Sequence, residues 1–74
     1  MEELIKRVCV LILLDGTLDQ SPSYIQEKWD IQDWGLRGAI QSLDMWNMRK
    51  LRRYLNRWHV ECPEAELILN EYGV

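Results

Sequence analysis

The fold is decided by residues 43–59, LDMWNMRKLRRYLNRWH, where apolar and basic side chains alternate at helical spacing. When residues are placed at about 100° intervals, the apolar side chains fall within one arc of roughly 120°. This apolar arc contains Met48, Leu51, Tyr54, Leu55 and Trp58. The pattern predicts an amphipathic helix from Met45 to about His59, with this arc packed on a core.

A break in the chain is predicted at Asp44. Aspartate is a good N-cap residue, and Leu43 before it and Met48 after it occupy the two positions of a hydrophobic staple. A helix running unbroken from Ala39 would place Asp44 and Asn47 inside the apolar arc, where burying them unpaired is costly. The long helix is therefore expected to begin after Asp44.

The N-terminal segment, residues 2–14, also has helical periodicity, with apolar residues three and four positions apart. Asp15-Gly16 is typical of a helix C-terminus. From Val8 onward the segment is apolar on every side, which predicts burial all round in its second half. A strand over Arg7–Leu14 is the alternative, but the chain has no other convincing strand to pair with it.

Three further helices are expected. Ser21-Pro22 predicts a helix start and a helix running to about Asp30, because serine suits the cap and proline the first position. In residues 31–43 a short or irregular helix is predicted, capped by Asp33. Its shared face would consist of Leu36, Ile40 and Leu43. Pro63 predicts the start of a last helix, which Gly73 ends. The inner face of that helix would consist of Ala65, Ile68, Leu69 and Tyr72.

The predicted architecture is all-α, with residues 1–74 forming a single helical domain. Four helices and one short irregular helix, joined by short loops, should pack as a compact bundle or an orthogonal array. A chain of 74 residues is marginally stable by its size alone. Its four Trp and three Tyr allow a dense core, or leave a sticky face if they exceed it.

Composition argues against several classes of protein. The longest uninterrupted apolar run, Val8–Leu14, is far shorter than the roughly 20 residues that a membrane-spanning helix needs. The acidic start, Met-Glu-Glu, lacks the basic residues of a secretory signal. Two cysteines, Cys9 and Cys62, are too few for a disulfide scaffold. We therefore expect a cytoplasmic protein that does not cross a membrane.

Asp15-Gly16-Thr17 matches half of the D-x-D-G-T loop of phosphatase-like enzymes. The nucleophile of that loop would stand at Leu13, and 74 residues cannot build the parallel sheet that carries it. Gly35-Leu36-Arg37-Gly38 matches the backbone-clamping loop of KH domains, but the sheet of that fold is missing. Asp15-Gly16 is interpreted as a helix stop and turn, and Gly35-Leu36-Arg37-Gly38 as a loop or a helix start.

Catalysis and metal binding have little support. The chain has one histidine, and His59 with Cys62 and the distant Cys9 gives three candidate ligands where structural zinc needs four. No spacing suggests a pairing of nucleophile and base. We expect no catalytic site, no metal site, no cofactor and no small-molecule substrate.

The strongest functional signal is the charge on the predicted helix 45–59. Five of the nine Lys and Arg residues of the chain lie there, in an arc of roughly 160° opposite the apolar arc. They are Arg49, Lys50, Arg52, Arg53 and Arg57. Trp46 projects among them, where an indole can stack on a partner or form cation–π contacts. The predicted partner-binding residues are Trp46, Arg49, Lys50, Arg53 and Arg57.

Three interpretations of this basic face remain open. It could be a solvated surface neutralised by acidic segments of the chain itself, such as Glu61–Glu66. It could bind a protein partner, which predicts a small regulatory protein engaging an acidic protein or a second copy of itself as a homodimer. It could bind nucleic acid through phosphates, although the net charge of −3 argues weakly against that. The apolar end of the N-terminal helix is a second reason to expect a homodimer.

Overall fold

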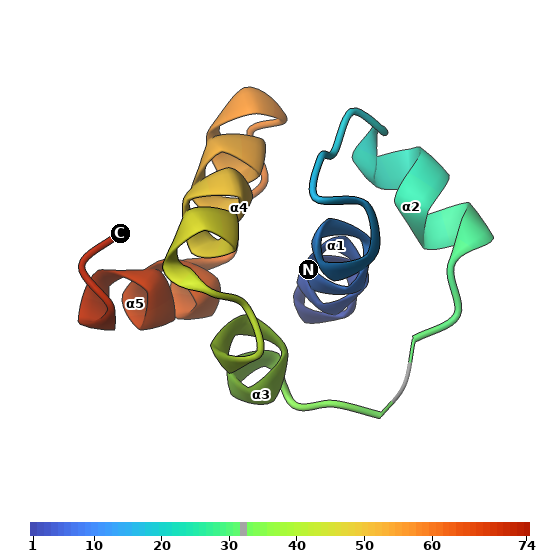
Figure 1. Ribbon diagram of the computed structural model, residues 1–74. Helices are drawn as coiled ribbons and strands as arrows, with labels where there is room; N and C mark the ends of the chain where they lie inside the picture. Colours follow the sequence, from blue (N-terminus) through green and yellow to red (C-terminus); the bar gives the residue numbers. More distant parts are fainter. Residues whose placement is uncertain (32) are drawn as a thin grey trace.

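The computed structural model describes residues 1–31 and 33–74, and these residues form five α-helices and no strand (Figure 1). The helices are α1 (Glu2–Asp15), α2 (Pro22–Lys28), α3 (Leu36–Gln41), α4 (Met45–Arg57) and α5 (Pro63–Glu71). The predicted all-α fold, with four longer helices and one short one, is confirmed.

Helix α1 lies at the centre of the arrangement and packs against α2, α3 and α4, while α5 packs against α3 and α4. In Figure 1, α1 and α3 are seen nearly end-on, and α4 rises beside them. The five helices form a compact all-α globule around a core to which all five contribute.

Local signals set most helix ends where they were predicted. Gly16 ends α1 in the left-handed conformation, with φ of 71°, and its N–H donates to the Ile12 carbonyl over 2.8 Å. Ser21 accepts a hydrogen bond from the Tyr24 N–H over 3.3 Å, and Asp44 accepts one from the Asn47 N–H over 2.8 Å. The break at Asp44 is confirmed, and it separates α3 from α4 by three residues.

The predicted cap of α3 is wrong. Gly35, not Asp33, precedes the helix, in an extended conformation and with no side-chain cap. A capping side chain reaches the N–H groups two or three positions after it, and Asp33 lies too far before the first turn to do so. The predicted face of this segment is confirmed, because Leu36, Ile40 and Leu43 are all buried.

The core follows the predicted apolar arc of α4. Met48, Leu51, Tyr54 and Leu55 are buried, and Trp58 packs partly buried against them. On α5 the predicted inner face is right for its first three residues and wrong for Tyr72, which is 37% exposed. Helix α5 ends at Glu71, one residue before the predicted end, so Tyr72 lies in the turn that closes the helix.

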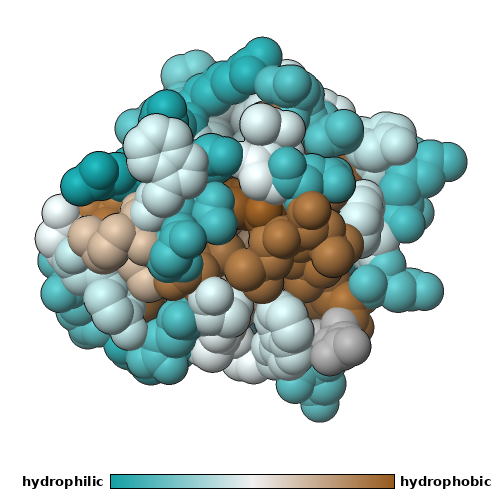
Figure 2. Space-filling model, in the orientation of Figure 1, coloured by the Kyte–Doolittle hydropathy of each residue, from teal (hydrophilic) through white to brown (hydrophobic). Residues whose placement is uncertain are grey.

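The second half of α1 is not buried all round as predicted. Leu13 is 41% exposed and Leu14 is 67% exposed. Helices α2, α3 and α4 pack against α1 but leave these two leucines exposed. The hydrophobic surface near the centre of Figure 2 includes this uncovered end.

Both cysteines are buried and unpaired, as a small apolar residue in a core would be. Burial raises the pKa of the Cys9 thiol from 9.0 to about 12. No helix among the described residues is long and apolar enough to cross a membrane.

Candidate functional site

The outer surface of α4 brings together the five residues predicted as a binding site, and we call these five the basic face. They are Trp46, Arg49, Lys50, Arg53 and Arg57. All of them lie on the side of α4 opposite its buried residues. Trp46 is 60% exposed, the three arginines are exposed and Lys50 is half-buried.

Two cations hold the indole of Trp46 against the helix. The Lys50 Nζ lies 5.9 Å and the Arg53 guanidinium carbon 6.0 Å from the centroid of the ring. Cation–π contacts at exposed sites contribute about 0.5–1 kcal/mol each. The indole is therefore both accessible and restrained, because Lys50 stands about one turn and Arg53 about two turns further along the same side of α4.

Few acidic groups of the chain reach this face. Arg57 forms an exposed ion pair with Asp19, with 3.3 Å between Nη1 and Oδ1, and also stacks near the Trp58 ring. Exposed ion pairs of this kind contribute little to stability. In residues 1–31 and 33–74, Arg49, Lys50 and Arg53 have no carboxylate within ion-pair distance. The described segment 61–66 forms no ion pair with the basic face.

Arg52 was predicted to share the basic arc but has a different role. Its Nη2 donates hydrogen bonds to the Asn70 Oδ1 over 2.6 Å and to the Val74 carbonyl over 2.9 Å. A cation at a helix C-terminus satisfies carbonyls that the helix leaves free and interacts favourably with the helix dipole. Arg52 therefore ties α4 to the end of α5 and does not belong to the basic face.

A hollow of about 240 Å³ adjoins the basic face, which the sequence did not predict. Lys50, Arg53 and Arg57 line one side of it, and Thr17–Asp19 of the loop between α1 and α2 line another. Tyr54 also lines the hollow. Its hydroxyl is buried with no hydrogen-bond partner among the described residues, and burial raises its pKa to about 12. No local signal places a distant loop beside α4, so the hollow follows only from the packing of α1.

Lys50 also reaches the C-terminal end of α1. A Cβ added at Gly16 would lie 3.6 Å from the Lys50 Nζ. The last turn of α1 contains no basic residue of its own, so Lys50 supplies the cation that the negative end of a helix favours. The basic face and the end of α1 are thus neighbours in space, with Lys50 between them.

The uncovered end of α1 forms a second surface, the α1 patch, defined by Val10, Leu13, Leu14, Trp29 and Trp34. With Asp30 these residues surround a depression of about 340 Å³. The sequence predicted surplus apolar surface on α1 but did not place Trp29 and Trp34 beside it. The helix predicted to run from Pro22 to about Asp30 would include Trp29, but α2 ends at Lys28 and Trp29 lies just past its end.

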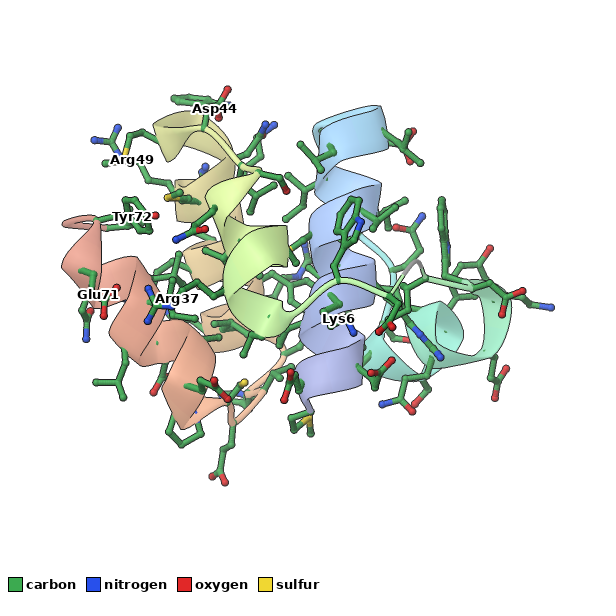
Figure 3. All side chains as sticks on the ribbon, turned by 90° about the horizontal axis from the view of Figure 1, so that it is seen from below. Lys6, Arg37, Asp44, Arg49, Glu71 and Tyr72 are labelled. Carbon is green, nitrogen blue, oxygen red and sulfur yellow. The ribbon has the colours of Figure 1, made fainter. Side chains whose placement is uncertain are left out.

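The other motifs lie apart from both surfaces. Gly35 caps α3 and Gly38 lies inside it, so this pair forms a helix start and no loop. His59 is exposed at a positive φ of 52°, whereas Cys62 is buried. Within the described ranges, no three His, Cys, Asp or Glu side chains are grouped as metal ligands would be. Arg37 and Glu71, labelled in Figure 3, form an ion pair between α3 and α5 over 2.6 Å.

Comparisons of the chain with models of protein families, with curated proteins and with solved structures find no match in any of the three.

Proposed function

We propose that the chain is a small, non-catalytic regulatory protein that binds an acidic segment of a protein partner through the basic face of α4. The observation that carries this proposal is the surroundings of Trp46. The indole is exposed, two cations hold it in place, and neither cation has a carboxylate partner among the described residues.

This combination matches the energetics of protein interfaces. Trp and Arg are enriched among the residues that dominate binding energy, because they bury large areas and form paired hydrogen bonds. A side chain that is already restrained loses less conformational entropy on binding. An acidic segment with an apolar residue would cover the indole and pair its carboxylates with Arg49, Lys50 and Arg53.

The other charges of the chain favour an acidic protein segment over a nucleic acid. The net charge is −3 although five cations are concentrated on α4. Asp44 caps the N-terminus of that helix, and Asp19 lies beside Arg57. Carboxylates at these two positions would repel the closely spaced phosphates of a duplex, whereas a short peptide can avoid them.

Nucleic-acid binding is the second candidate, and one observation favours it. Three residues, Ser42–Asp44, connect α3 to α4, and the two helices point in different directions in Figure 1. A helix-turn-helix likewise joins two inclined helices by a turn of about three or four residues, and its second helix enters the major groove. Here that helix carries Trp46, Arg49 and Arg53 on its outer side.

The proposal is tested by fluorescence anisotropy with three labelled probes. They are a short peptide of alternating glutamate and leucine, its lysine counterpart, and a duplex DNA of mixed sequence. The variants are Trp46→Ala and Arg53→Glu, and Lys28→Glu on α2 is a control because it makes the same charge change at an exposed lysine. Unfolding by urea should show that Trp46→Ala stays folded and loses no more than the roughly 1–2 kcal/mol of its two cation–π contacts.

The acidic peptide is expected to bind, and Trp46→Ala and Arg53→Glu should each weaken it about 10-fold, or about 1.4 kcal/mol. Lys28→Glu should have little effect. The proposal would be contradicted if the acidic peptide did not bind, or if it bound Trp46→Ala as tightly as the wild type. If the duplex bound more tightly than the acidic peptide, and its affinity fell steeply between about 50 and about 200 mM salt, the nucleic-acid candidate would be supported instead.

We also retain the prediction of a cytoplasmic setting. It is supported by the two buried, unpaired thiols of Cys9 and Cys62, which a reducing compartment preserves.

A further inference from the structure

The α1 patch is a cluster of apolar surface, unlike the isolated exposed leucine of α5. Leu14 is 67% exposed, and Leu13, Val10, Trp29 and Trp34 surround it. Figure 2 shows hydrophobic residues gathered on this face of the molecule. Small soluble proteins rarely leave contiguous apolar surface uncovered unless it binds something. Leu67, at 65% exposed, stands outside this cluster and provides a matched comparison.

The patch carries both a projection and a hollow. Leu14 is exposed at the end of α1, and the depression of about 340 Å³ lies next to it, lined by Trp29 and Trp34. A two-fold interface requires one surface to be complementary to itself. The projecting leucine of one copy and the depression of another meet this requirement.

The charges around the patch are also self-complementary. In Figure 1, α1 lies between α4 on one side and α2 on the other. Lys50 of α4 lies at the end of α1, and Asp30, which follows α2, lines the depression. A two-fold axis through the patch would bring the basic side of each copy to the acidic side of the other.

From this apolar centre and its two oppositely charged sides, we infer that the α1 patch binds a second copy of the chain in a two-fold homodimer. An interface of standard size buries roughly 800 Å² per partner, less than a fifth of the 4563 Å² surface of this chain. In the dimer, Leu14 is covered by Trp29 and Trp34 of the second copy, and Lys50 faces Asp30 of that copy.

Sedimentation equilibrium tests the dimer over concentrations from about 1 μM to about 1 mM. The wild type is expected to shift from 8.9 kDa to twice that mass. Leu14→Glu and Leu14→Lys should both remain monomeric, and Leu67→Glu should dimerise like the wild type. Circular dichroism checks folding. Leu14→Lys is included because a cation suits the C-terminal end of a helix, so its loss of dimer is not a loss of helix.

Three outcomes would overturn the inference. They are a wild type that stays monomeric at about 1 mM, a Leu14 variant that dimerises normally, and loss of the dimer in Leu67→Glu.

Exchanging the charges of Lys50 and Asp30 tests whether these two residues pair across the two-fold axis. Lys50→Asp and Asp30→Lys should each weaken the dimer several-fold, and the double variant should restore it. A double variant weaker than either single variant would refute the pairing.

This inference and the proposed function can fail separately. The dimer test reads molecular mass and uses Leu14, which lies outside the basic face. The peptide test reads anisotropy and uses Trp46 and Arg53, which lie outside the α1 patch. Only Lys50 takes part in both proposals, as a member of the basic face and as a charge beside the α1 patch, so it is used in the charge exchange alone.

Discussion

Burial changes the chemistry of single side chains in this small protein. Cys9 is fully buried, and desolvation of its thiolate raises the pKa of the thiol to about 12. Tyr54 is buried as well, and desolvation raises its pKa from 10.0 to about 12. Both groups therefore resist ionisation in the folded chain and ionise more easily when it unfolds.

Stability should fall at alkaline pH for this reason. A group whose pKa is raised on folding stabilises the folded state fully below its unfolded pKa, and that stability is lost as pH rises toward the folded pKa. The pH range over which this stability is lost runs from about 9 to about 12 for Cys9 and from about 10 to about 12 for Tyr54. Urea unfolding at a series of pH values measures this loss.

Two substitutions test whether Cys9 and Tyr54 cause the loss of stability at alkaline pH. Cys9→Ala should show a shallower fall in unfolding free energy than the wild type above about pH 9, and Tyr54→Phe should do so above about pH 10. Lys28→Glu serves as a surface control and should keep the wild-type slope. If both core variants retained the full slope, neither buried group would be responsible.

At the scale of single helices, the ends of each element follow from short-range chemistry. Gly16 ends α1 and Asp44 begins α4 because each acts on backbone groups within one turn of itself, which a sequence pattern captures. Asp33 failed as a cap because Gly35 adopts the extended conformation that begins α3. The exposed end of α1 and the hollow beside Lys50 could not be predicted, because they depend on which distant segments pack nearby.

Alanine substitutions at two glycines should change stability in opposite directions, because the two glycines have different backbone conformations. Gly38 lies inside α3 with open space around it, so Gly38→Ala should stabilise the protein by about 0.5–1 kcal/mol. Gly16 has φ of 71°, so Gly16→Ala should destabilise it by about 1–2 kcal/mol. The nearest atom to the new Cβ would be the Lys50 Nζ at 3.6 Å, an ordinary contact, so the loss comes from the backbone.

Thermal unfolding of the two variants measures both effects. The melting temperature should rise for Gly38→Ala and fall for Gly16→Ala. The same sign of change in both would show that backbone conformation does not decide these positions.

At the scale of the whole molecule, the two proposed roles belong to two different surfaces: partner binding to the basic face and dimerisation to the α1 patch. The basic face could be predicted from the sequence because a helix fixes the angular positions of its own residues, and the exposed indole lies where the periodicity places it. The α1 patch joins residues from α1 and from the connection between α2 and α3. Only the packing of α1 against its neighbours brings them together.

Dimerisation should also change how the whole protein melts. A second copy that binds only the folded state raises the melting temperature with protein concentration. The wild type is expected to show this dependence, and Leu14→Glu should melt at one temperature over the same range. A wild type whose melting temperature is independent of concentration would argue against the dimer.

The positions of the four indoles give this protein a built-in optical reporter. Trp46 is exposed, while Trp29, Trp34 and Trp58 are partly buried against the core. Acrylamide should therefore quench the long-wavelength edge of the emission first, and a ligand on α4 should shield that edge. Self-association would instead protect the light emitted by Trp29 and Trp34, so one unlabelled sample can distinguish which surface is occupied.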